Sequence, residues 1–139
     1  MITTAERTPY SKPYKWSYTD DVEYPEADAL ARAATSFTSP LAAWEAIIVL
    51  SRPDQLDCSC ADSHAVVAEW LEARNIALLD PPSPRDVLSH AVAVAQKHGI
   101  GKRALSNFDC FHYAYAKASR QPLLTLDSLL RQTDVATLP

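Results

Sequence analysis

The sequence lacks the features that mark membrane and secreted proteins. No run of apolar residues approaches the roughly 20 that a helix needs to cross a bilayer. Its first 16 residues, MITTAERTPYSKPYKW, contain no apolar stretch like that of a secretory signal, so export by that route is not supported. We therefore expect a cytoplasmic protein that has no membrane partner.

Cysteine and positive charge are also scarce. The three cysteines, Cys58, Cys60 and Cys110, are an odd number, and the first two are too close for the usual paired zinc knuckle, which indicates a reduced compartment. Thirteen Lys and Arg against seventeen Asp and Glu give a formal charge of −4. This balance argues against attachment to nucleic acid by overall charge. A nucleic-acid substrate would need a local basic patch or bound metal ions.

The remaining composition is that of one globular domain. With 139 residues, of which 47% are hydrophobic and 22% charged, the chain buries roughly two thirds of its unfolded surface and needs no disulfide to fold. We expect residues 1–24 to form an atypical extension or a replaced first strand, in which Tyr14–Thr19 alternates as a strand does. Residues 25–139 are predicted to form the domain itself.

Strand-like and helical segments alternate after residue 24. Helices are predicted over 25–35, 40–52, 64–74, 84–98, 107–119 and 128–131, and apolar strands over 76–79 and 123–126. Ser39 and Ser83 stand before first-turn prolines, and Ser63 is predicted to cap the third helix. Helical periodicity places Trp44 on an apolar face. The alternation predicts an α/β fold with a parallel sheet under helices.

Three carboxylates occupy places where functional groups gather in parallel sheets, near the carboxyl ends of strands. Asp127 follows the last predicted strand, Asp109 lies in the first turn of a largely apolar helix, and Glu45 lies in the second turn of its helix. Acids that meet in one pocket are best neutralised by a hard cation such as Mg²⁺ or Mn²⁺. Such an ion suits phosphodiester hydrolysis, because it activates water and offsets charge on the phosphate.

Other candidate residues lie near Asp109. Lys102 and Arg103, in the preceding loop, are candidates to bind backbone phosphates. His112 is one helical turn after Asp109, where it is predicted to contact RNA phosphate or to support a metal ligand. An ordinary, partly buried histidine is the simpler alternative.

Three segments together resemble the PIN domain of VapC-type toxins. They are SPLAAWEAIIVL at 39–50, HGIGKRALSNFDCFHYAYAKA at 98–118, and QPLLTLD at 121–127 with a closing TD. The resemblance extends from about Tyr24 to Asp134. It implies a PIN-like three-layer α/β/α fold with a short parallel sheet and a Mg²⁺- or Mn²⁺-dependent endoribonuclease. It also implies a homodimer and an antitoxin partner similar to VapB.

By motif match, Glu45, Asp109 and Asp127 take the places of the family's catalytic, metal-binding acids. The first strand of the family ends in an Asp-Thr/Ser-Ser-Ala motif that this sequence lacks, and Asp20 is the candidate to replace its acid as a fourth metal ligand. Three hypotheses stay open. The chain is a toxin-type endoribonuclease, a catalytically impaired PIN-like module that binds an antitoxin, itself or RNA, or an unrelated α/β protein with structural acids.

Overall fold

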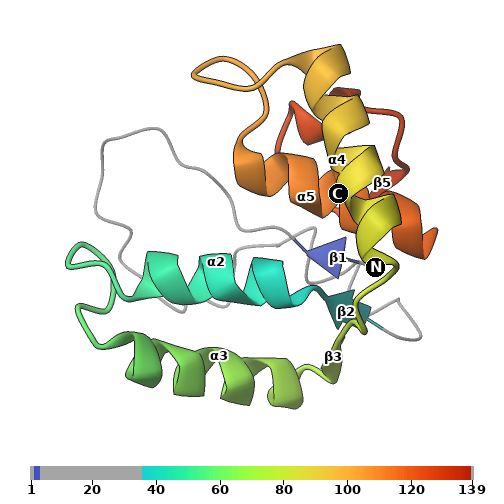
Figure 1. The fold of residues 1–139 in the computed structure, drawn as a ribbon. Helices are drawn as coiled ribbons and strands as arrows, with labels where there is room; N and C mark the ends of the chain where they lie inside the picture. Colours follow the sequence, from blue (N-terminus) through green and yellow to red (C-terminus); the bar gives the residue numbers. More distant parts are fainter. Residues whose placement is uncertain (1, 4–35, 139) are drawn as a thin grey trace.

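The structure is a computed structural model that describes residues 2–3 and 36–138 (Figure 1). The described helices are α2 (Pro40–Leu50), α3 (Cys60–Ala73), α4 (Pro84–His98) and α5 (Asn107–Ser119), with a 3-10 turn η1 (Leu130–Gln132). The described strands are β1 (Ile2–Thr3), β2 (Ser36–Thr38), β3 (Ile76–Leu78), β4 (Leu123–Leu124) and β5 (Thr137–Leu138). None of the described helices is long and apolar enough to cross a membrane.

All strand pairs are parallel. β4 pairs with β1 on one side and with β5 on the other, and β2 pairs with β3. Because β1 also lies beside β2, the order across the strands is β3-β2-β1-β4-β5. Connections therefore run outward in both directions from β1, which places a topological switch point between β1 and β4. The predicted α/β class with a parallel sheet is confirmed.

The helices form two pairs on either side of the strands. α4 packs along α5 and α3 packs along α2, and α2 also contacts α5. Figure 1 shows α4 and α5 above β1, β2 and β3, and α2 and α3 to the left of these three strands. This arrangement has three layers.

Each described α-helix begins after a serine whose hydroxyl accepts a hydrogen bond from a backbone N–H three residues later. The four serines are Ser39, Ser59, Ser83 and Ser106. Such a cap stabilises the helix start by about 1 kcal/mol. The predictions from Ser39-Pro40 and Ser83-Pro84 are confirmed, because proline fits the first turn of a helix.

The start predicted for the third helix is wrong. Ser63 does not cap it, because α3 begins at Cys60 with Ser59 as its cap. Ser59 accepts a hydrogen bond from the Asp62 backbone N–H and donates its hydroxyl to the Asp62 carboxylate at 2.6 Å. Ser63 lies inside the first turn of α3 and is fully buried. The segment predicted as a polar loop is therefore helical in its second half.

The structure describes a strand that the sequence analysis does not predict, at the very start of the chain. The parallel register pairs Ile2 with Leu123 and Thr3 with Leu124. The predicted Tyr14–Thr19 strand, the helix over 25–35 and Asp20 lie outside the described residues. The division of the chain after residue 24 stays a prediction.

The core lies between α4, α5 and β4. Its buried members are Val87, Ala91, Val94, Leu105, Cys110, Tyr113, Ala114, Ala116, Leu123, Leu130 and Val135. Four of them belong to α5, so this helix is covered by neighbours along most of its length and its position is fixed by packing.

We expect the Leu123→Ala variant to be less stable by about 3 kcal/mol, because this side chain is fully buried in the central strand of its sheet and its removal leaves a cavity. The control is Leu88→Ala, since Leu88 is 59% exposed, and its effect should stay within about 0.5 kcal/mol. Urea unfolding measures both free energies. Equal effects would contradict the described core.

Candidate active site around the first turns of α5

The three predicted acids lie on separate elements. Glu45 is in the second turn of α2, Asp109 is in the first turn of α5, and Asp127 follows β4. All three are partly buried, and each carboxylate accepts a hydrogen bond from the described residues. Their partners decide what each acid can do.

Glu45 binds His112 across the interface between α2 and α5. Its Oε2 atom lies 2.7 Å from Nε2 of His112, and the two side chains are 13% and 0% exposed. The other ring nitrogen of His112, Nδ1, is buried and has no hydrogen-bond partner in the part of the chain that the structure describes. We assign to Nε2 the N–H that donates to Oε2 of Glu45, because a proton on Nδ1 would have no acceptor among the described residues.

The prediction that His112 contacts RNA needs correction. Its ring is fully buried, so it has no surface that a phosphate can reach in this structure. The other expectation for this residue, support of a predicted metal ligand, agrees with the hydrogen bond to Glu45. The sequence hint was the spacing of three residues from Asp109, but the partner, 67 positions away, left no local signal.

Asp109 completes a capping box with Ser106. Its Oδ2 accepts the Ser106 backbone N–H at 2.6 Å, and its own N–H donates to the Ser106 hydroxyl at 3.1 Å. The positive end of the helix dipole stabilises this carboxylate. Burial, followed by the charge of Asp109, raises the pKa of the neighbouring Cys110 thiol. Cys110 is therefore a protonated core residue and not a nucleophile.

Asp127 organises the turn that follows β4. Its Oδ1 accepts the backbone N–H groups of Leu129 at 2.7 Å and Leu130 at 3.1 Å. Its own backbone N–H donates to the Thr125 hydroxyl. These bonds fix the Asp127 carboxylate at the carboxyl end of the sheet, where the 3-10 turn η1 begins.

The three acids fit a divalent cation by their chemistry. Each uses one carboxylate oxygen in hydrogen bonds and keeps a second oxygen that accepts none from the described residues. Carboxylate oxygens are the ligands that Mg²⁺ and Mn²⁺ prefer. However, residues 2–3 and 36–138 contain no group of three or more His, Cys, Asp or Glu that could hold a metal ion. The described acids alone do not complete such a site.

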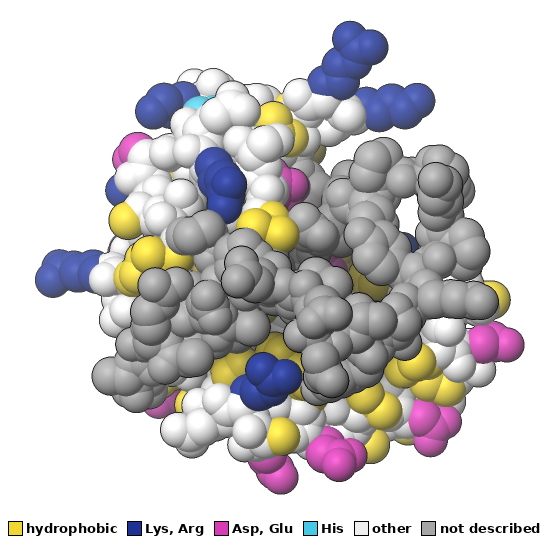
Figure 2. All heavy atoms as spheres, turned by 180° about the vertical axis from the view of Figure 1, so that it is seen from behind, with side chains coloured by type: hydrophobic (Ala, Val, Ile, Leu, Met, Phe, Trp, Pro, Cys, Tyr) yellow, Lys and Arg dark blue, Asp and Glu magenta, His cyan; other side chains and the backbone are white. Residues whose placement is uncertain are grey.

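The charge of the chain is divided between its two halves. Residues 84–120 contain six Lys and Arg against two Asp and Glu, whereas residues 40–78 contain two Lys and Arg against six Asp and Glu. In Figure 2 acidic side chains line the lower edge and basic ones project mainly from the upper part. Residues 84–120 therefore carry a net positive charge, although the net charge of the whole chain is −4.

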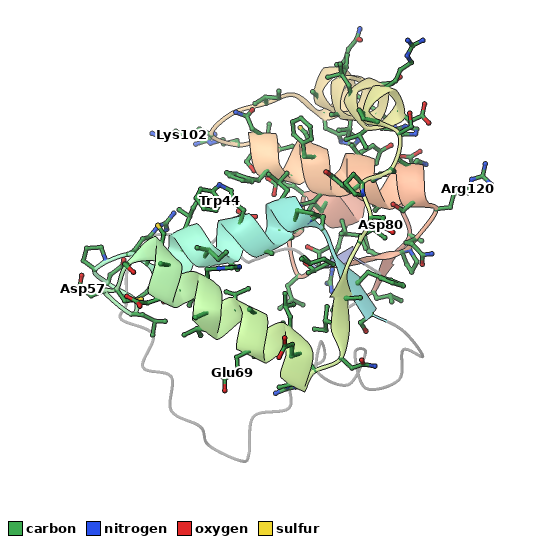
Figure 3. The ribbon with its side chains drawn as sticks, turned by 60° about the horizontal axis from the view of Figure 1, so that its bottom comes forward. Trp44, Asp57, Glu69, Asp80, Lys102 and Arg120 are labelled. Atoms are coloured by element: carbon green, nitrogen blue, oxygen red, sulfur yellow. The ribbon has the colours of Figure 1, made fainter. Side chains whose placement is uncertain are left out.

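Lys102 and Arg103 are exposed and lie in the loop between α4 and α5, within this basic half. Neither forms an ion pair with another described residue. Trp44, which periodicity placed on the apolar face of α2, is instead 47% exposed. Figure 3 shows Lys102 and Trp44 on the same side of the molecule. An exposed indole is a surface on which a nucleobase can stack.

A family comparison decides the identity of this fold. Residues 16–136 match the PIN domain. The chain belongs to the PIN domain family. PIN domains have a three-layer α/β/α, nuclease-like fold, so the predicted family and fold are confirmed, and PIN domains generally use divalent metal ions. No curated protein is similar enough to the chain to be matched.

A fourth acid, Asp134, follows η1 and contacts the later part of α5. It accepts hydrogen bonds from the Tyr113 hydroxyl at 2.7 Å and from Lys117 Nζ at 3.1 Å. These bonds, the one from Tyr113 first, lower the pKa of Asp134 from 3.8 to about 2. Burial and the bond to Asp134 raise the pKa of Tyr113. This network ties the last turns of α5 to the C-terminal segment.

The network predicts a pH dependence of stability. Since the pKa of Asp134 is lower in the folded state, its contribution is present above about pH 4 and is lost as the pH falls toward 2. Asp134→Asn should lower the melting temperature at pH 7, and its difference from the parent should vanish near pH 2. The effect is small, because the Asp134 side chain is 56% exposed. Asp80→Asn, at an exposed position after β3, is the control; a difference that persists at pH 2 would contradict the assignment.

Proposed function

We propose that the chain is a metal-dependent endoribonuclease of the VapC toxin type, which hydrolyses phosphodiester bonds in RNA. The proposal is supported by the match of residues 16–136 to the PIN domain, together with the hydrogen bond that brings Glu45 to His112 on α5. Asp109 and His112 are three positions apart and share a face of α5, and Glu45 is bonded to His112. Glu45 and Asp109 therefore approach the same face of α5.

In this proposal Glu45, Asp109 and Asp127 hold one or more Mg²⁺ or Mn²⁺ ions, and Asp20 supplies the ligand that the first strand provides in the family. The bound ion would lower the pKa of a water molecule and offset the charge that builds up on the phosphate. The chain's own hydrogen bonds keep each carboxylate oriented before the ion binds. Lys102 and Arg103, exposed and without ion-pair partners among the described residues, would hold the RNA backbone.

Protein partners belong to the proposal as well. We propose a homodimer and an antitoxin similar to VapB, both in the cytoplasm. Support for a protein partner comes from a groove of about 180 Å³ between α4 and α5. Its rim exposes Leu88, Val92, Ile100 and Phe111. Apolar side chains gathered on a surface in this way mark a contact site for another protein.

The alternative function is a catalytically impaired PIN module that acts by binding an antitoxin, itself or RNA. Two observations favour it. The Asp-Thr/Ser-Ser-Ala motif is missing from the sequence, and the described residues contain no group of three possible metal ligands. Cleavage and metal binding have to be measured separately, because this alternative retains binding without cleavage.

The test is cleavage of a quenched fluorescent RNA by the purified chain in Mn²⁺, in Mg²⁺ and in EDTA. We expect cleavage that needs the metal and falls by about 100-fold or more in Asp109→Asn and in Glu45→Gln, because each loses a ligand charge while the shape of the side chain is kept. Asp80→Asn is the matched control, since Asp80 is exposed and has no hydrogen bond or ion pair among the described residues, and it should cleave as the parent does.

The melting temperature with and without Mn²⁺ separates the alternatives, since an ion that binds only the folded protein raises it. An increase in the parent but not in Asp109→Asn, without any cleavage, would support the impaired module. Neither cleavage nor an increase would show that the acids have structural roles only.

A further inference from the structure

We propose that His112 is a positioning residue, which holds the carboxylate of Glu45 in the orientation in which Glu45 binds a divalent cation. This inference rests on the proposed function. It gives His112 a role through Glu45, with no contact between the imidazole and the RNA.

The hydrogen bond between His112 and Glu45 uses one of the two carboxylate oxygens and leaves the other available to bind a cation. Only Oε2 of Glu45 is bonded to His112, and Oε1 accepts no hydrogen bond from the described residues. An imidazole that donates to one oxygen of a carboxylate restricts its rotation and directs the second oxygen. The Glu45 side chain is 13% exposed, so it is not completely closed off from solvent.

The ring of His112 is itself held in place. It is fully buried and stacks on Phe108, with ring centroids 6.4 Å apart and planes inclined by 27°. The next two residues, Tyr113 and Ala114, belong to the core cluster that fixes α5. A donor on a rigid, packed helix gives a ligand the fixed orientation that a functional site requires.

Packing alone does not explain a histidine at this position. A leucine would fill the site without the cost of burying a polar ring. His112 nevertheless leaves Nδ1 without a hydrogen-bond partner, so the bond from Nε2 to Glu45 is the only polar interaction of the ring among the described residues. That single bond is what the histidine provides and a leucine would not.

The test compares two apolar variants, His112→Leu and His112→Phe, with His112→Gln, whose amide can still donate to Glu45. Each protein is titrated with Mn²⁺, and both the increase in melting temperature and the rate of RNA cleavage are followed. We expect the apolar variants to need about 10- to 100-fold more Mn²⁺ in both measurements, the range found when the partner of a metal ligand is removed. His112→Gln should restore most of the affinity.

Tyr113→Phe is the matched control, because it removes a 2.7 Å hydrogen bond from the adjacent position of α5 to a carboxylate outside the proposed site. It should lower the melting temperature without changing the Mn²⁺ dependence. The inference is overturned if the apolar variants behave like this control. If neither apolar variant folds, His112→Gln decides alone. A folded His112→Gln protein that needs about ten-fold more Mn²⁺ than the parent would overturn the inference, because its amide can still donate a hydrogen bond to Glu45.

The two proposals fail in different ways. A parent that cleaves RNA with metal, accompanied by apolar variants with unchanged Mn²⁺ dependence, overturns the role of His112 alone. A parent with neither cleavage nor a response of its melting temperature to Mn²⁺ overturns the proposed function, and the role of His112 with it. If the parent protein binds Mn²⁺ without cleaving RNA, the Mn²⁺ dependence of the melting temperature alone decides whether His112 positions Glu45.

Discussion

A carboxylate buried between two helices must find a donor, and this requirement links the two halves of the molecule. Glu45 and His112 form the only side-chain hydrogen bond between α2 and α5 among the described residues. Removal of either partner would leave the other buried without its hydrogen bond, which costs more than the bond itself contributes. The pair therefore joins the acidic half, built on α2 and α3, to the basic half, built on α4 and α5.

The sequence predicted those elements whose signals are local. Ser39-Pro40 and Ser83-Pro84 place two helix starts correctly, because a cap and a first-turn proline act over three or four residues. Ser59 and Ser63 both precede helix-forming residues, and only the reciprocal bond between Ser59 and Asp62 identifies the first as the cap. The strands Ile2–Thr3 and Thr137–Leu138 have no local signal of their own. Both exist because β4 offers backbone partners on its two sides, which is a property of the fold and not of a sequence pattern.

The sequence named candidate residues for the site, but it could not predict which hydrogen bonds each of them forms. Asp109 in the first turn of a helix and Asp127 after a strand are places where a carboxylate caps backbone N–H groups, and also places where it holds a metal ion. One carboxylate has two oxygens, so both uses are compatible, and the spacing of residues does not distinguish them. In the structure, one carboxylate oxygen of Asp109 and one of Asp127 accept hydrogen bonds from backbone N–H groups. The pairing of Glu45 with His112 could not be predicted, because 67 positions separate them and only the packing of α2 on α5 brings them together.

Net charge was the least informative property of the chain. A value of −4 argues against attachment to RNA by overall charge, yet the excess of acids belongs to residues 40–78 and an excess of bases belongs to residues 84–120. A phosphate that approaches α5 meets the field of nearby groups, because charges beyond about 8 Å are largely screened at physiological ionic strength. Acids near the start of α5 would still repel that phosphate, and Lys102 and Arg103 are exposed side chains at the surface. A divalent cation on the acids would turn this repulsion into attraction, so in the proposed function substrate binding and metal binding would depend on the same carboxylates.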